Sequence, residues 1–366
     1  MRHMILTFVL AVIFVLTRAL AGMANSSPSY FMMIVSLLLG MLIILGGCEL
    51  FANGVEHLGD RLNLSHATVG SLLAAVGTAL PETIVPVLAL LFGKAQHREG
   101  IAVGAILGAP FMLSTLAMFL LGITVLVRKL MKKSPRAELG ANMKALWFEL
   151  KFILLTMAVV LAASLLHKSL FNHIGAAVLL ISYALFFYYS LRHEAEEGEQ
   201  FAENFHFGAF LGYPKRAVWI GLQVVVGLAF IVAGAFLFVD YISLLSVRSG
   251  VSPLVLSLLI VPFATELPEK FNSISWTLKG KDTLALANIT GAVVFQSTIP
   301  VSIGLLFTDW SIGGIELLNI FSVILMTALI AVVVSLKNKI PAWLLLSGGL
   351  FYFLYIVFGL VVNHPA

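Results

Sequence analysis

Hydrophobic residues in this chain fall into long runs separated by short polar stretches. A helix needs about 20 residues to cross the hydrocarbon core of a bilayer, and these runs approach or exceed that length. The pattern therefore predicts an all-α polytopic membrane protein in which the polar stretches connect spanning helices. The predicted spans cover residues 4–22, 31–52, 67–92, 101–127, 150–167, 171–191, 217–239, 253–278, 283–307, 313–335 and 341–362.

The first run has two interpretations. Arg2 and His3 precede it, and small residues follow Arg18, as in a signal peptide with its cleavage site. Because an arginine fits poorly just before a cleavage site, an extra spanning helix is the favoured interpretation of residues 1–30. We therefore expect about ten core helices together with this additional N-terminal helix.

Composition supports a membrane location. Of the 366 residues, 60% are hydrophobic and 11% are charged, whereas soluble domains are about half apolar and a quarter charged. The formal net charge of +4 fits loop lysines and arginines and not a nucleic-acid-binding patch. The sequence contains no glycine-rich phosphate loop, no Walker-type lysine and no Ser-His-Asp set, so it predicts neither an enzyme nor a cofactor.

Basic residues predict the orientation. The 128–151 loop is the most basic, so the positive-inside rule places it in the cytoplasm. Counting spans from this loop places the 192–216 linker inside and the C-terminus outside, and the sequence predicts a multi-pass protein of the inner (plasma) membrane. Two further loops then also face the cytoplasm, one with Lys279 and Lys281 and the other with Lys337 and Lys339.

Two parts of the chain resemble each other. Residues 64–82 (LSHATVGSLLAAVGTALPE) align without a gap with residues 251–269 (VSPLVLSLLIVPFATELPE). After a small difference in loop length, residues 101–115 align with residues 284–298, and both stretches end in Ser-Thr. By the span count, the two copies cross the membrane in opposite directions, which predicts inverted repeats. The first repeat covers 31–191, the linker 192–216 and the second repeat 217–366.

One acidic residue stands at the same position of each copy, inside a predicted span. These residues are Glu82 and Glu269. A charged group in a span costs about 2.5–3.5 kcal/mol on insertion scales, so such groups are functional candidates by default. Thr78 and Thr265 lie four residues before the glutamates and share their helix face.

A proline precedes each glutamate. A proline lacks an N–H, so the carbonyls of Gly77 and Ala264, four residues before these prolines, lose their helical hydrogen bonds. Each copy thus offers a carboxylate, a hydroxyl and a carbonyl, and such oxygen sets suit hard cations such as Ca²⁺ or Na⁺. The expected partners are therefore inorganic cations and the lipid bilayer. The alternative to a cation site is that each proline only kinks its helix for packing and each glutamate pairs with a buried polar group.

At these residues the sequence resembles the cation/Ca²⁺ antiporter superfamily of the sodium/calcium exchanger type. Its repeats carry Gly-Thr-Ser-Leu-Pro-Glu followed by a Gly-Asn-x-x-Gly-Ser helix. The first motif stands here as GTALPE at 77–82 and ATELPE at 264–269, and the second as GAILGA at 104–109 and ANITGA at 287–292. The resemblance implies ten core helices, Ca²⁺ extrusion driven by Na⁺ or H⁺, and Glu82 and Glu269 as central ligands.

The chain departs from the family pattern in both motifs. The Ser after the motif Thr is replaced by Ala79 in the first copy and Glu266 in the second. The Ser that ends the second motif is replaced by Ala109 and Ala292. The second copy thereby gains Glu266 as a further candidate ligand.

The family also has a polar Asn or Asp four residues beyond the second motif. The matching positions are Leu113 and Gln296, so only the second copy keeps a candidate ligand there. With so few side-chain oxygens, binding of several Na⁺ ions is disfavoured, whereas a buried carboxylate can carry a proton. The alternatives are an antiporter for a different cation, or a non-transporting or channel-like protein that keeps the exchanger fold.

Two polar residues of the second copy have several interpretations. Lys270 follows Glu269 directly, and it extends to the membrane interface, pairs with Glu266 four residues before it, or neutralises the site. Asn288 either contacts the cation or donates a hydrogen bond to a neighbouring helix.

Overall fold

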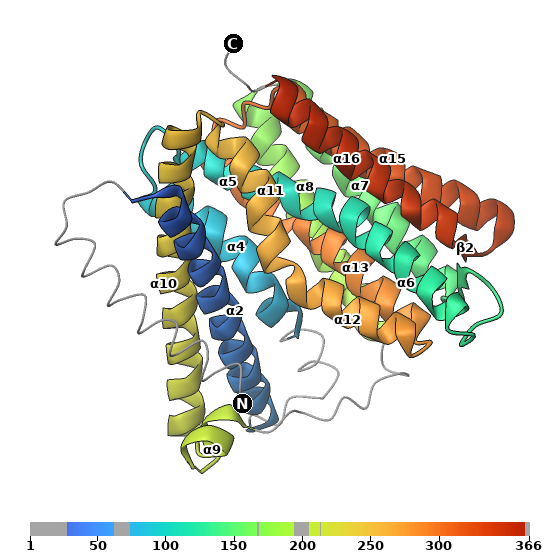
Figure 1. Cartoon of the computed structure of the whole chain (residues 1–366), viewed down its shortest axis with the longest axis horizontal. Helices are drawn as coiled ribbons and strands as arrows, with labels where there is room; N and C mark the ends of the chain where they lie inside the picture. The colour runs from blue at the N-terminus through green and yellow to red at the C-terminus, as the bar shows by residue number, and fades with distance from the viewer. Residues whose placement is uncertain (1–27, 62–73, 167, 194–204, 213, 363–366) are drawn as a thin grey trace. The chain divides into compact units, whose positions relative to one another are not determined.

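The structure is a computed structural model, shown in Figure 1. The span predicted at 4–22 lies outside the residues that it describes, as do the start of the 67–92 span, part of the 192–216 linker and the end of the chain. The described residues are 28–61, 74–166, 168–193, 205–212 and 214–362.

The chain forms two units, and each unit contains helices from both predicted repeats. The first unit comprises Met1–Ile101 and Phe187–Ser249, and the second comprises Ala102–Phe186 and Gly250–Ala366. The helices α5 (Arg98–Met112) and α8 (Ser169–His193) each cross the boundary between them.

The first unit is built on two long helices, α2 (Tyr30–Arg61) and α10 (Ala217–Ser249), which lie side by side (Figure 1). A Cβ atom at Gly40 would lie 3.1 Å from the carbonyl oxygen of Gly234, and one at Gly47 would lie 2.8 Å from that of Gly227. Glycines at these positions let the two backbones approach closely. Because the contact positions advance along α2 as they recede along α10, the helices are antiparallel, as inverted repeats require.

Two shorter helices complete the first unit. The helix α4 (Ala74–Phe92) packs against both long helices, and the ring centroids of Phe92 and Phe236 are 4.9 Å apart. The short helix α9 (His206–Leu211) is fixed by a buried polar contact, in which the N–H of Phe207 donates to Oε1 of Gln223 at 2.9 Å.

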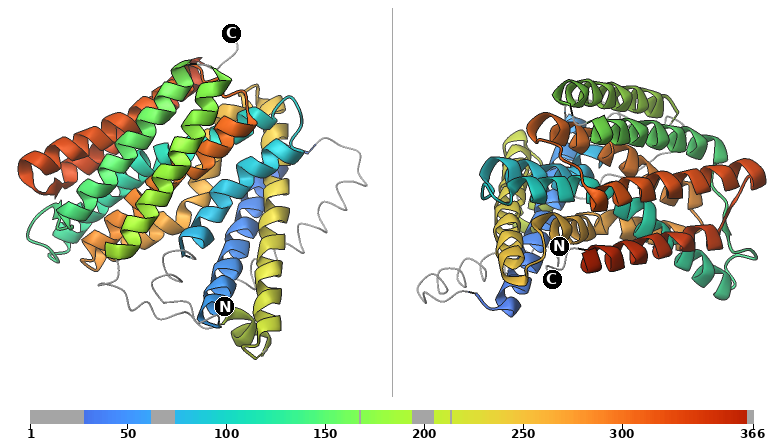
Figure 2. Two further views of the ribbon diagram at one scale, coloured as in Figure 1. Left: turned by 180° about the vertical axis from the view of Figure 1, so that it is seen from behind. Right: turned by 90° about the horizontal axis from the view of Figure 1, so that it is seen from above.

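The second unit is a bundle with an apolar core. Phe148 and Phe152 of α7 contact Phe186 of α8 at centroid distances of 5.8 and 5.4 Å, and these two helices run side by side in Figure 2. Besides parts of α5 and α8, the unit contains η2 (Leu113–Ala117), α6 (Met118–Leu130), α7 (Met143–Leu166), α11 (Pro253–Thr265), α12 (Leu267–Leu278), α13 (Asp282–Gln296), α14 (Ile299–Phe307), α15 (Gly314–Lys337) and α16 (Ala342–Val362).

The helices confirm the predicted fold class. Among the described residues, 7 helices are long and apolar enough to cross a membrane, and shorter apolar helices accompany them. The chain is an all-α polytopic membrane protein. The helices α2 and α10 continue beyond the predicted 31–52 and 217–239, because hydropathy marks the bilayer core and not the point where a helix ends.

Three predicted spans are less regular than expected. The 101–127 span contains the π-helix η2, the 253–278 span divides at Glu266, and the 283–307 span divides after Gln296. A proline stands in the first turn of each new helix, α12 and α14, where its missing N–H leaves no helical hydrogen bond unmade. Hydropathy alone makes both of these spans continuous.

Three loops meet at one end of the second unit. The strand β1 (Glu138–Leu139) pairs antiparallel with β2 (Ile340–Pro341), and Arg128 forms an ion pair with Asp282. These loops were all predicted to lie on the same side of the membrane. The two-residue strands were not predicted, since they are too short for an alternating pattern.

Candidate cation site

The second copy of the first motif, ATELPE at 264–269, lies at a break between two helices. Helix α11 ends at Thr265, α12 begins at Leu267, and Glu266 between them has φ −85° and ψ 7°. The N–H of Glu266 donates to the carbonyl of Pro262 at 3.1 Å, and the N–H of Lys270 donates to the carbonyl of Glu266 at 3.2 Å. The break places a short irregular segment within an apolar stretch.

The oxygen-bearing side chains around this break are buried. Thr265, Glu266 and Glu269 are 3%, 1% and 5% exposed. Among the described residues, neither carboxylate oxygen of Glu266 nor Oε2 of Glu269 has a hydrogen-bond donor. Burying a carboxylate without a partner is unfavourable. A bound cation would compensate these oxygens.

A lysine lies next to these carboxylates. Lys270 is 4% exposed, and its Nζ donates to the carbonyl of Pro262 at 3.2 Å and lies 3.2 Å from Sδ of Met112. The prediction that this side chain extends to the membrane interface is therefore wrong. The ammonium is held inside the unit by contacts between α12, α11 and α5.

Asn288 connects two helices. Its Nδ2 donates to the carbonyl of Glu269 at 3.1 Å and to Oγ of Ser273 at 3.0 Å. The expected hydrogen bond to a neighbouring helix is confirmed. The sequence analysis did not select Ser273, although it follows Glu269 by four residues and therefore shares its helix face.

The last candidate of the second copy lies at another helix end. Gln296 is the final residue of α13 and is buried, and its Oε1 has no donor among the described residues. In the next residue, Oγ of Ser297 lies 2.8 Å from Oγ1 of Thr156. The equivalent Ser114 of the first copy lies in the π-helix η2, so both copies leave α-helical geometry at this position.

The first copy has a simpler local structure. Glu82 is buried in α4, which also includes Gly77 and Thr78 and runs from Ala74 to Phe92 without interruption at Pro81. The second copy breaks at the corresponding position. The structure thus places Thr265, Glu266 and Glu269 at the break between α11 and α12, and Asn288 of α13 donates to the carbonyl of Glu269. The roles of Gly77, Thr78 and the Ala264 carbonyl stay predictions.

Buried carboxylates at a break between helices are the usual setting of ion sites in polytopic membrane transporters. The sodium/calcium exchanger protein family matches residues 32–192 and 219–362, and the chain belongs to that family. It is 23% identical over 320 residues to an uncharacterized membrane protein, MJ0091, of Methanocaldococcus jannaschii, covering 87% of this chain and 94% of the relative.

Two further similarities agree with this assignment. The inner membrane protein YrbG of Escherichia coli is 25% identical over 338 residues, covering 88% of this chain and 96% of YrbG. A solved structure of the H⁺/Ca²⁺ exchanger CAX matches with a TM-score of 0.71 at 18% identity, covering 100% of this chain and 89% of that chain. At this identity the structural match shows the fold alone.

Proposed function

We propose that the protein is a secondary active antiporter that exports Ca²⁺ in exchange for Na⁺ or H⁺ by alternating access. Glu82 and Glu269 are the central ligands, with Thr78 and Thr265 beside them. The protein lies in the inner (plasma) membrane with its 128–151 loop on the cytoplasmic side. The family supports cation exchange, and the repeated motif supports one carboxylate from each copy.

One observation carries the proposal. The carboxylates of Glu266 and Glu269 are buried at the α11–α12 break, and three of their four oxygens lack a hydrogen-bond donor among the described residues. Hard cations such as Ca²⁺ bind carboxylate, carbonyl and amide oxygens. A helix interrupted in the middle of an apolar stretch is also the usual setting of ion sites in secondary transporters.

The oxygen ligands are unequally divided between the copies. Glu266 and Gln296 provide side-chain oxygens in the second copy, where the first has Ala79 and Leu113. We propose that the second copy determines which cation binds. Return transport needs the same carboxylates to be neutralised by Na⁺ or H⁺, and this competition couples the two fluxes.

The two long helices are the proposed moving part of this cycle. Their glycine contacts hold α2 and α10 at close range along several turns. Closely packed backbones resist separation. We therefore propose that α2 and α10 move as one body when the protein changes the side on which the ion is accessible.

Transport into proteoliposomes tests the proposal. The purified protein is reconstituted, and Ca²⁺ uptake is measured under an imposed Na⁺ gradient and, separately, under a pH gradient. The proposal expects uptake that requires one gradient and is lost in Glu82→Gln and in Glu269→Gln. Absence of Ca²⁺ flux under both gradients, with protein that is folded and inserted, would contradict it.

A matched control separates loss of a ligand from loss of a buried charge. Glu316 is also buried in a span of the second unit, but its Oε2 accepts the N–H of Gly313 at 3.1 Å at the start of α15. Glutamine keeps an acceptor for this bond. Glu316→Gln is therefore expected to retain uptake.

A further inference from the structure

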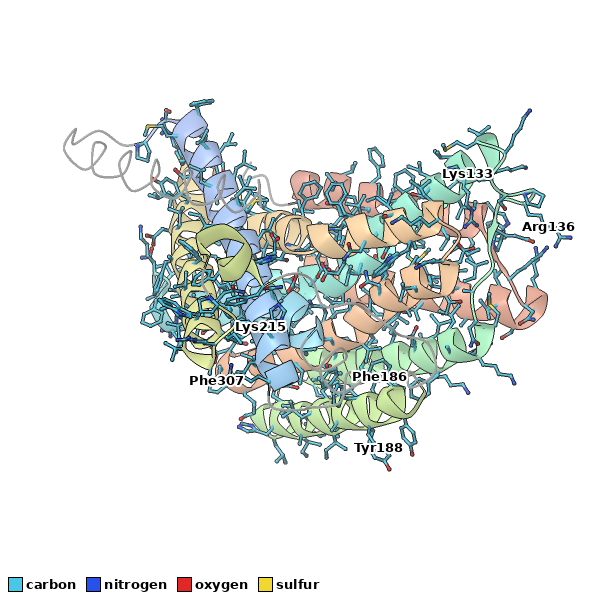
Figure 3. The ribbon with its side chains drawn as sticks, turned by 90° about the horizontal axis from the view of Figure 1, so that it is seen from below. Lys133, Arg136, Phe186, Tyr188, Lys215 and Phe307 are labelled. Atoms are coloured by element: carbon cyan, nitrogen blue, oxygen red, sulfur yellow. The ribbon has the colours of Figure 1, made fainter. Side chains whose placement is uncertain are left out.

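A basic cavity lies where the loop after α6 meets the end of α12. Its volume is about 380 Å³, and Arg128, Lys133 and Lys279 line it together with Ser134 and Gly280. No acidic side chain occurs among its described lining residues. Figure 3 shows Lys133 at the end of the helix that carries Arg128, with Arg136 further along the same loop.

The backbone turns that end two helices position the lysines. After α6, Lys132 takes φ 57°, and the N–H of Lys133 donates to the carbonyl of Arg128 at 3.1 Å. After α12, Gly280 takes φ 78°, and the N–H of Lys281 donates to the carbonyl of Trp276 at 2.9 Å. Both turns close in the manner of a helix C-terminal Schellman motif, so the backbone beneath the cavity is ordered.

Arg128 supplies the buried part of the cavity. It is 5% exposed, and its terminal nitrogens bind Asp282, the carbonyl of Thr277 at 2.9 Å and the carbonyl of Glu138 at 3.2 Å. Its Nε has no acceptor among the described residues. Asp282 balances the charge of this guanidinium. The remaining charge of the cavity comes from Lys133 and Lys279, which are exposed and form no ion pair with a described residue.

We propose that this cavity binds the phosphate group of an anionic ligand. Two ammonium groups and an arginine N–H without an acceptor among the described residues are donors of the kind that bind a phosphate group, whereas the Ser134 hydroxyl already donates to the carbonyl of Arg136 at 3.0 Å. The cavity lies where the apolar span Arg98–Leu130 ends and the span Asp282–Phe307 begins, so a bilayer that covers both spans would place its lipid headgroups at the level of this cavity. A phospholipid with a phosphomonoester headgroup and a free phosphate share this chemistry.

Thermal unfolding of the full-length protein in neutral detergent tests the site. Its melting temperature is measured with inorganic phosphate, with phosphatidic acid in mixed micelles, and with phosphatidylcholine as the neutral lipid. We expect phosphatidic acid, phosphate or both to raise the melting temperature by roughly 2–4 °C. Phosphatidylcholine is expected to have no such effect. A shift with the lipid alone identifies a headgroup site, and a shift with inorganic phosphate identifies a site for a soluble anion.

A pair of double variants separates this cavity from general charge attraction. Lys133→Ala/Lys279→Ala removes the two ammonium groups, whereas Lys129→Ala/Lys144→Ala removes the same charge from exposed lysines outside the cavity. We expect the first to weaken ligand binding by about tenfold and the second to change it little. All four lysines are exposed, so these variants keep the core. Equal weakening in both double variants, or no shift with either phosphate ligand, would overturn the proposal.

Discussion

The two copies of the repeated motif differ most in their charged residues. The first copy has Ala79 and Thr83 where the second has Glu266 and Lys270, four residues apart. The added glutamate and lysine leave the net charge of the segment unchanged. In the structure both are buried, and the second segment breaks into α11 and α12, whereas the first remains the continuous helix α4.

This difference teaches that a repeated carboxylate need not have a repeated environment. Glu82 and Glu269 occupy the same motif position, but a lysine follows Glu269 in the sequence where a threonine follows Glu82, and Asn288 donates to the Glu269 carbonyl. A nearby ammonium lowers the attraction of a carboxylate for other cations. The second copy therefore combines more candidate oxygen ligands with a positive charge in the same segment, and each variant below tests one part of that asymmetry.

Removing the glutamate that both copies have at the same motif position is expected to have the largest effect on Ca²⁺ uptake. In Glu269→Gln, the initial rate of Ca²⁺ uptake into proteoliposomes should fall about a thousandfold, because loss of one buried charged partner costs about 4 kcal/mol. Glu82→Gln should have an effect of the same order. A fall confined to one of the two variants would mean that the copies do not share the ion equally.

The sequence predicted this carboxylate and most of the fold, for a physical reason. Apolar runs and a repeated Leu-Pro-Glu are one-dimensional signals: the runs located the helices, and the motif selected Glu269, which is buried and whose role as a ligand stays a prediction. The sequence could not predict the hydrogen bonds from Asn288 to Ser273 and from Lys270 to the Pro262 carbonyl, because they depend on which atoms face one another near the helix break. The π-helix at Leu113–Ala117 likewise has no distinct hydropathy pattern. Such contacts become visible only in three dimensions.

The next test converts the two buried charged residues of the second copy into the residues of the first. Glu266→Ala and Lys270→Thr each remove one of two opposite charges four residues apart in the chain, so each unbalances the charge of the buried segment and should lower stability by about 3 kcal/mol. The double variant Glu266→Ala/Lys270→Thr should lose clearly less than the sum of the two. Melting temperatures of the four proteins form the double-mutant cycle. Additive losses would show that the two residues act independently.

A smaller effect is expected from the helix that follows each motif. A Cβ atom at Gly108 would lie 2.4 Å from the carbonyl oxygen of Leu258, whereas one at the equivalent Gly291 meets no described atom within 4 Å. Gly108→Ala should therefore destabilise the protein by about 1–3 kcal/mol through overpacking. Gly291→Ala should stay within about 0.5 kcal/mol of the original protein. Equal melting temperatures for the two variants would contradict this difference between the copies.

The smallest effect concerns the amide that supports Glu269. The position equivalent to Asn288 in the first copy is Ala105, so Asn288→Ala makes the two copies alike there. The variant removes the hydrogen bonds to the Glu269 carbonyl and to Ser273. Hydrogen bonds between membrane helices contribute about 0.6 kcal/mol on average, so a modest loss of stability is expected. If Asn288 only positions α12, Ca²⁺ uptake should fall a few-fold at saturating Ca²⁺ while the half-saturating concentration stays nearly constant. A rise of tenfold or more in that concentration would instead assign the Asn288 side chain to the ion itself, and the second copy would then hold one more direct ligand than the first.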